Sequence, residues 1–213
     1  DRIVASIDWS ATVLDIASIP KPAKMQGRIF LGENDEGERE HAFAGRDRGD
    51  ETVDFIRTVR SKQFRYIKNF YPNRPFTQLN RYKENSYPVL RLMHRLYDEG
   101  KLSGAPAALM TSTRPKEELY DIDADPYEIH NLADSTQHQQ ELKKLRQALD
   151  TWMDKIDDKG RIPESPETIA VHEEAMKKNY TIRLEEQSKY ESEHGIQLIA
   201  PKALTNRINR LRR

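Results

Sequence analysis

The fold is decided by residues 114–133, which read RPKEELYDIDADPYEIHNLA. Within this stretch, Glu118–Asp121 sets an aliphatic and an aromatic residue between acidic neighbours, as in a short strand. Residues 123–126 end in a proline, which fixes its own φ and removes a backbone donor, so the chain must turn there. Residues 131–133 lead directly into an amphipathic segment. The order is therefore strand, turn and helix.

A long helix is predicted over residues 137–158, because its large apolar residues recur every three or four positions. These residues are Leu142, Leu145, Leu149, Trp152, Met153 and Ile156. One continuous apolar stripe of this kind needs a partner surface. We expect the helix to cover a small sheet that contains the strand around residues 119–120.

A β-hairpin is predicted from residues 56–60 and 64–70, where apolar and polar residues alternate on either side of a short connection, Ser61-Lys62-Gln63. Basic and aromatic residues also interleave on nucleic-acid-binding surfaces, but alternation on a half-buried hairpin explains this pattern better. The expected fold class is α+β. A small antiparallel sheet of about four strands would be covered by the long C-terminal helix.

Residues 3–19 predict a helix that ends at Pro20, with Asp8 or Ser10 as its N-cap. Its predicted buried stripe consists of Ile7, Ala11, Val13, Leu14, Ile16 and Ala17. Two further helices are expected, from Pro88 to Gly100 and over residues 166–194. The first carries a stripe of Val89, Leu92, Met93, Leu96 and Tyr97, and the second a weaker one of Ile169, Met176, Tyr180 and Leu184.

The composition excludes several classes of protein. Thirty-five basic residues balance thirty-five acidic ones, so no net field favours nucleic acid or an acidic membrane surface. Cysteine is absent, which rules out disulfides and thiolate metal sites. The sequence has no apolar run long enough for a membrane span and no signal-like start. Because it opens with Asp1 inside a hydrophobic pattern, we expect a fragment, a processed chain or a truncated product.

The sequence motif of residues 118–133, E-L-Y-D-x-x-x-D-P-x-E-x-x-N-L-A, closely resembles a segment near the C-terminus of the sulfatases of the alkaline phosphatase superfamily. The same family has a helix matched by Asp8, Thr12, Leu14, Asp15, Ala17 and Ile19, followed by a turn matched by Met25-Gln26-Gly27-Arg28. Its hairpin is matched by Arg57, Val59, Arg60, Tyr66 and Ile67, with Arg65 where a lysine is common. The resemblance covers roughly residues 3–157 and fades beyond them.

This resemblance implies the C-terminal portion of a sulfatase, in three parts. Residues 1–31 would be the tail end of the α/β catalytic domain, with the first helix packing on its sheet. Residues 32–160 would form the C-terminal subdomain, and residues 161–213 a charged helical extension with a basic tail at Arg207–Arg213.

The chemistry of the family is not found in this sequence. Sulfatases use a formylglycine made from the Cys or Ser of a C/S-x-P/A-x-R motif, together with a calcium ion held by Asp and Asn residues. No such motif occurs here, and the family's metal ligands lie upstream of where this chain begins. We assign no catalytic and no metal-binding residue, and expect the chain alone to be inactive. Calcium and formylglycine are implied for the intact enzyme only.

Three residues are candidates for substrate binding: Arg46, Asp47 and Arg48, predicted in a loop between glycines over residues 45–51. Guanidinium groups donate two parallel hydrogen bonds, which suits sulfate or phosphate oxygens. In the resembling family a loop at this point approaches the mouth of the active site. The alternative is a solvated loop whose Arg and Asp side chains pair with one another.

Two functions follow. The first is the rear part of a sulfatase, acting with an N-terminal catalytic portion on a sulfated sugar or aryl sulfate. The second is a stand-alone interaction module derived from a sulfatase. A phosphodiesterase or phosphonate hydrolase of the same superfamily is a further alternative. For a bacterial sulfatase, a periplasmic or secreted location would be expected.

Overall fold

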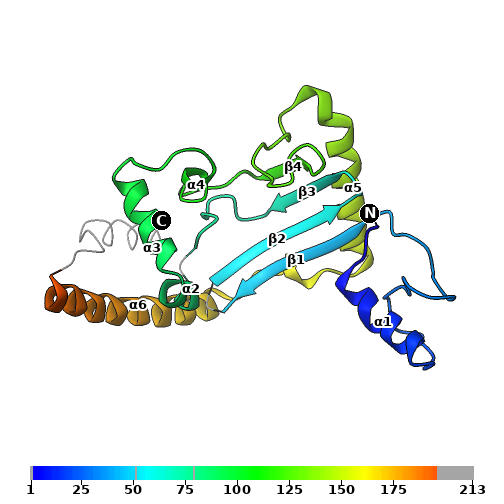
Figure 1. Cartoon of the computed structure of the whole chain (residues 1–213), viewed down its shortest axis with the longest axis horizontal. Helices are drawn as coiled ribbons and strands as arrows, with labels where there is room; N and C mark the ends of the chain where they lie inside the picture. The colour runs from blue at the N-terminus through cyan, green and yellow to red at the C-terminus, as the bar shows by residue number, and fades with distance from the viewer. Residues whose placement is uncertain (1, 51, 79, 196–213) are drawn as a thin grey trace. The chain divides into compact units, whose positions relative to one another are not determined.

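The computed structural model describes residues 2–195 except 51 and 79, so the basic tail predicted at Arg207–Arg213 lies outside the described residues. Four strands form one sheet in the order β1 (Ala42–Gly49), β2 (Thr52–Arg60), β3 (Phe64–Asn69) and β4 (Glu117–Asp121) (Figure 1). The helices are α1 (Ser6–Ile16), α2 (Arg81–Ser86), α3 (Pro88–Asp98), α4 (Gly104–Ala108), α5 (Gln139–Lys155) and α6 (Pro166–His194), with 3-10 turns at Thr136–His138 and Lys159–Arg161.

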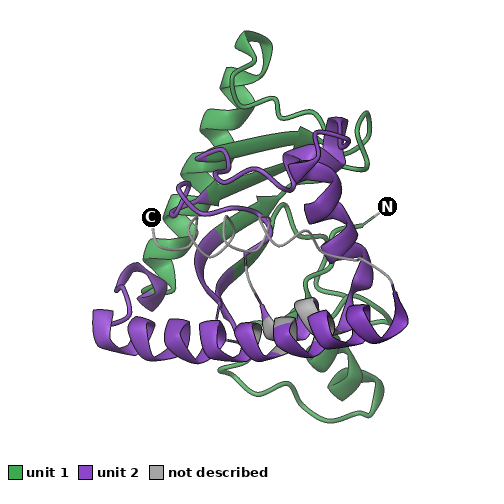
Figure 2. Cartoon of the chain, turned by 90° about the vertical axis from the view of Figure 1, so that its left-hand side faces the viewer, with its two compact units in different colours: residues 1–45, 57–68, 117–158 green, residues 46–56, 69–116, 159–213 purple. Residues whose placement is uncertain are grey.

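The sheet is antiparallel, and the predicted α+β class is confirmed. Strands β3 and β4 pair with Tyr66 opposite Leu119 and Phe64 opposite Asp121. The chain divides into two compact units (Figure 2). Unit 1 comprises residues 1–45, 57–68 and 117–158, and unit 2 comprises residues 46–56, 69–116 and 159–213.

Side chains of the stretch from 114 to 133 hold its backbone in place. The Asn131 side chain accepts hydrogen bonds from the N–H groups of Leu119 (2.9 Å) and Ala133 (3.0 Å), and donates one to the carbonyl of Glu117 (3.1 Å). The Asp125 carboxylate accepts from the backbone amides four and five residues ahead, both at 2.7 Å. The positions of Asp125 and Asn131 thus allow their side chains to pair with backbone groups that a turn leaves without partners.

The core of unit 1 contains the predicted stripe of α5. Leu142, Leu145, Leu149 and Met153 are buried, and Trp152 stacks on Phe43 of β1 with ring centroids 4.9 Å apart. The predicted bounds were too generous, because the first turn is a 3-10 turn and the helix ends at Lys155. As a result Ile156, predicted to be buried, is 41% exposed.

Polar side chains of α5 also reach the strands. Arg146 donates to both carboxylate oxygens of Glu117 on β4, at 2.7 and 2.8 Å, and Asp150 accepts from Lys68 on β3 at 2.8 Å. Together with the Trp152 stack on β1, α5 therefore contacts three of the four strands. These contacts support the expected cover of the sheet by this helix.

The N-terminal helix buries a different face from the predicted one. Asp8, Ala11 and Thr12 are its buried residues, whereas Trp9 is 60% and Ile16 68% exposed. The N-cap is Ala5, so the prediction of Asp8 or Ser10 is wrong. The predicted apolar stripe is largely exposed because nothing among the described residues covers it.

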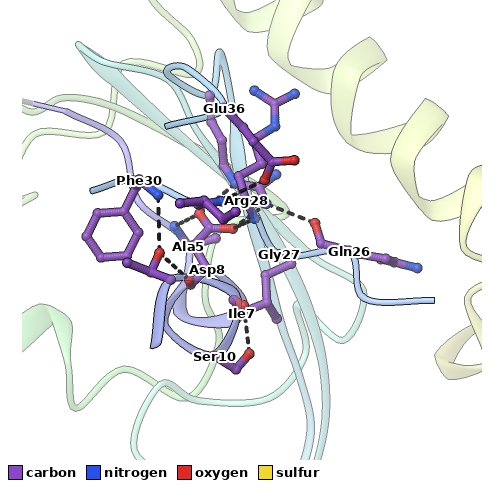
Figure 3. A network of polar contacts seen from close by, with 12 residues as sticks. Ala5, Ile7, Asp8, Ser10, Gln26, Gly27, Arg28, Phe30 and Glu36 are labelled. Atoms are coloured by element: carbon purple, nitrogen blue, oxygen red, sulfur yellow. Dashed lines mark hydrogen bonds and ion pairs between the residues drawn. The ribbon is translucent and has the colours of Figure 1, made fainter. Parts of the chain in front are cut away.

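Asp8 joins α1 to the segment that follows it (Figure 3). Its carboxylate accepts from the backbone N–H groups of Ala5 and Arg28, both at 2.8 Å, and pairs with the Arg39 guanidinium. Gly27 packs so closely on the helix that an added Cβ would lie 2.1 Å from the carbonyl oxygen of Ile7. Only glycine fits this turn.

We expect Asp8 to make the stability of the chain acid-sensitive. Burial raises the pKa of Asp8, but hydrogen bonds from Arg39, Arg28 and Ala5 outweigh it and lower the pKa to about 2. Since the folded pKa lies below the unfolded one, this stabilisation is complete above roughly pH 4 and is lost as the pH falls through about 2. Denaturant titrations from pH 5 to pH 2 should show a steeper loss for wild type than for Asp8→Asn.

A matched control is Asp35→Asn. Arg2 lowers the pKa of Asp35 to about 2 as well, but that pair lies at the surface. High salt should suppress the Asp35 contribution and leave the Asp8 contribution in place. Equal pH slopes for wild type and Asp8→Asn would contradict the role given to Asp8.

The other two predicted helices are confirmed in position. Pro88 is the first residue of α3, and Gly100 follows the helix with φ of 68°. The predicted stripe of α3 is only partly correct: Met93, Leu96 and Tyr97 are half-buried, but Val89 and Leu92 are exposed and the buried residue is Leu90. In α6 Met176 is buried, and the side chains of residues 180 and 184 lie outside the description.

Candidate functional site

The predicted charged loop forms the second half of a strand. Residues 45–49 belong to β1, so the prediction of a glycine-bounded loop over residues 45–51 is wrong for most of its length. Gly45 provides close approach instead of a turn, because an added Cβ would lie 2.9 Å from the Arg57 side chain. The chain turns later, at Asp50, whose φ of 52° lies in the left-handed region that Asp tolerates.

The strand separates Asp47 from its two arginine neighbours. Successive side chains of a strand point to opposite faces, which places Arg46 and Arg48 together and Asp47 opposite them. In agreement, both arginines are partly buried and Asp47 is exposed. The Arg46 guanidinium lies near Gly49, where an added Cβ would be 3.3 Å from Nη2. The structure therefore brings two of the three candidates to one face of unit 2.

Arg48 holds a carboxylate in its guanidinium fork. Its Nε donates to Oε1 of Glu164 at 3.0 Å, and its Nη2 donates to the other carboxylate oxygen. A third bond runs from Nη1 to the Asp50 carbonyl at 3.4 Å. The charge-assisted bonds from Arg48 lower the pKa of Glu164 below its usual value. This is the two-point geometry with which an arginine binds an oxyanion.

Unit 2 also contains a deeply buried ion pair. Arg114 donates to both oxygens of Asp54, one of them at 2.9 Å, and the two side chains are 1% and 0% exposed. The Asp54 carboxylate also accepts from the Gln78 side chain at 3.0 Å and from the Phe55 N–H at 2.9 Å. Both carboxylate oxygens of Asp54 are paired and the network is sealed from solvent, with Nε of Arg114 as its one buried nitrogen that lacks a hydrogen-bond partner. We therefore assign it a structural role.

The sequence analysis did not predict the partners of Arg48 and Arg114. Glu164 is 116 residues from Arg48, and no local pattern links them. The partner of Asp54 could have been anticipated, because Asp54 is the charged residue in a run of four buried residues, Thr52-Val53-Asp54-Phe55. A charge inside such a run implies a buried counter-ion elsewhere in the chain.

Within the part of the chain that the structure describes, no group of three or more His, Cys, Asp or Glu side chains could hold a metal ion. Over the same residues, no helix combines the length and apolar character that crossing a membrane requires. Arg46 and Arg48 can bind an anion there, but the described residues offer them no adjacent metal centre.

No protein-family model matches the chain. Among curated proteins, an ulvan-active sulfatase from Formosa agariphila is 36% identical over 164 residues, which cover 77% of this chain and 27% of the relative. A second ulvan-active sulfatase from that organism is 30% identical over 105 residues, 46% of this chain and 17% of the relative. The chain thus spans about a quarter or less of these relatives. They confirm its resemblance to a sulfatase.

Among solved structures, a 2-O GAG sulfatase is 20% identical with a TM-score of 0.49, and the match covers 76% of this chain and 28% of that one. A protein solved in complex with its substrate D-glucosamine-2-N,6-O-disulfate is 18% identical with a TM-score of 0.46, over 74% of this chain and 25% of that one.

Proposed function

We propose that this chain is the C-terminal part of a sulfatase that hydrolyses sulfate esters. The observation that carries the proposal is the 36% identity to an ulvan-active sulfatase over 164 residues. The sulfatase-like pattern E-L-Y-D…N-L-A of residues 118–133 supports it independently. In this proposal the nucleophile and the metal site lie outside the chain. The chain supplies the C-terminal subdomain and part of the rim of the substrate site.

The exposed face of α1 supports the proposed attachment to a catalytic domain. Ile7, Trp9, Val13 and Ile16 are each about half exposed or more, whereas the opposite face is tied down by Asp8. Large exposed apolar patches mark surfaces that contact another element. We assign residues 1–31 to the tail of the catalytic domain, residues 32–160 to the C-terminal subdomain and residues 161–213 to an extension.

For the substrate we take the ulvan-active relative as the guide. We propose a sulfated polysaccharide of the ulvan kind, whose sulfate group would contact Arg46 and Arg48. Two guanidiniums on one strand face, one of them already in a two-point contact with a carboxylate, support this assignment. Asp47, on the opposite face, is not retained as a substrate contact.

The calcium ion and formylglycine that the family implies do not fit this chain. It has no cysteine and no C/S-x-P/A-x-R sequence, and the described residues contain no metal-binding cluster. We therefore place both groups in the remainder of the intact enzyme and derive no catalytic step from them here.

Two observations test the proposal: the coding sequence upstream of residue 1, and the sulfatase activity of the intact enzyme compared with that of the purified chain. The coding sequence upstream of residue 1 should contain a C/S-x-P/A-x-R motif, and the intact enzyme should release sulfate from ulvan while the purified chain does not. An intact protein without that motif would instead favour a stand-alone interaction module. Turnover of a phosphodiester or a phosphonate ester, with no turnover of sulfate esters, would favour the other superfamily activities.

In the intact enzyme, Arg48→Ala should lower kcat/KM by roughly ten- to a hundredfold. A charge-assisted contact contributes about 1.5–3 kcal/mol, and each factor of ten corresponds to about 1.4 kcal/mol. Steady-state kinetics on ulvan oligosaccharides, with thermal melts of each variant, would measure it.

The matched control is Arg65→Ala, which removes an arginine from another partly exposed Arg–Glu pair, with Glu128 at 2.6 Å. It should leave kcat/KM unchanged. Wild-type kinetics in Arg48→Ala would remove this arginine from the substrate site.

A further inference from the structure

Several arginines among the described residues bind a carboxylate through two nitrogens, and their pairs differ in burial, as three of them illustrate. The Arg114–Asp54 side chains are 1% and 0% exposed, and those of Arg57–Asp158 are 5% and 6% exposed. For Arg48–Glu164 the values are 23% and 32%. An ion from solution cannot enter the first two pairs without local unfolding, whereas it can reach the third.

The chain around Glu164 makes this carboxylate a movable partner. Glu164 lies just outside α6, whose N-cap is Ser165, with Pro166 as the first helical residue. The Ser165 hydroxyl accepts from the Thr168 N–H at 3.2 Å, which fixes the start of the helix independently of Glu164. The Glu164 side chain can therefore rotate away from Arg48 without unwinding the helix.

The carboxylate also has the shape of the group it would replace. A carboxylate offers two oxygens to the guanidinium fork, and a sulfate monoester offers two of its three in the same way. A solvent-accessible pair contributes about 0–1 kcal/mol, and we take the upper end of this range for the partly exposed Arg48–Glu164 pair, which an incoming oxyanion can match.

We propose that Glu164 is an internal competitor for the anion site at Arg48, so that a sulfate group binds there by displacing the Glu164 carboxylate. This inference rests on the proposed function, since it requires Arg48 to contact the sulfate of the substrate. It makes Glu164 a residue that sets the affinity of the site without touching the reacting atoms.

The test is a titration of the 213-residue chain with sodium sulfate at constant ionic strength, followed by the Nε–H NMR signal of Arg48. Glu164→Gln keeps the size of the side chain and removes its charge. We expect sulfate to bind about two- to fivefold more tightly to this variant, the range that corresponds to an exposed pair of up to 1 kcal/mol.

Glu167→Gln is the matched control, because it removes the same charge three residues away. Hydrogen bonds from its own backbone N–H and from Ser165 lower the pKa of Glu167, and no arginine contributes to that shift. Its sulfate affinity should equal that of wild type. Arg48→Ala should abolish the binding in both the wild-type and the Glu164→Gln backgrounds.

The outcomes separate the two proposals. Sulfate binding that depends on Arg48 but is equal in wild type and Glu164→Gln would overturn the competitor role and leave the anion site standing. An equal gain in sulfate affinity in Glu167→Gln would show that the effect comes from net charge alone, and would also overturn the competitor role. No Arg48-dependent binding in any variant, together with wild-type kinetics for Arg48→Ala in the intact enzyme, would overturn both.

Discussion

Leu149→Asp should unfold unit 1. Leu149 is fully buried on α5, in the same core as Tyr66 and Leu119 of the sheet. Removing a buried leucine side chain costs about 2–5 kcal/mol, and placing an unpaired carboxylate there adds the cost of its desolvation. We expect a loss of roughly 4 kcal/mol or more, a large part of the stability of a typical domain. Urea titration followed by far-UV circular dichroism would measure it.

Gln147→Asp provides the control on the same helix. Gln147 is exposed, so the new charge remains in water and the free energy of unfolding should change by less than about 0.5 kcal/mol. A Leu149→Asp variant that melts like wild type would show that α5 does not pack with its predicted stripe inward.

Asp54→Ala should destabilise unit 2 by about 3–5 kcal/mol, because it leaves the Arg114 guanidinium buried without a counter-ion. The side chain of Gln78 and the N–H of Phe55 would lose their acceptor as well. The double variant Asp54→Ala/Arg114→Met should recover much of this loss, since it removes the uncompensated charge. Thermal and urea unfolding of the three proteins would give the coupling energy.

Glu164→Ala is the comparison for the exposed kind of pair. Its free energy of unfolding should fall by no more than about 1 kcal/mol. If Asp54→Ala cost as little as Glu164→Ala, the burial of the Asp54–Arg114 pair would have no energetic consequence, and the division into sealed and accessible pairs would be wrong.

Local sequence patterns predicted the elements whose causes are local. The strand at residues 117–121, the α5 stripe and the hairpin with its Ser61–Gln63 connection each depend on alternation, helical spacing or turn residues within a few positions. The resemblance to sulfatases added the identity of the region, which no periodicity could supply.

The failures share a different cause, which is contact between distant residues. Gly45 suggested a loop, but it is a strand residue that makes room for Arg57. The face of α1 was misjudged because Asp8 finds its partner at Arg39. For the candidate site, the sequence predicted Arg46 and Arg48 as anion-binding candidates. It could not predict Glu164 as the partner of Arg48.

The hydrogen bonds around Asn131 and Asp125 also bear on the order in which the chain folds. Strands β1 to β3 are neighbours in sequence, whereas β4 joins β3 only after residues 70–116. Closing a loop of that length costs about 3 kcal/mol of chain entropy, which makes the docking of β4 a slow, late step. Because Asn131 ties the strand residue Leu119 to Ala133 over a short span, residues 117–133 can acquire their shape before they dock. The segment then reaches the sheet edge with much of its conformational entropy already lost, and the barrier to completing the sheet is lower.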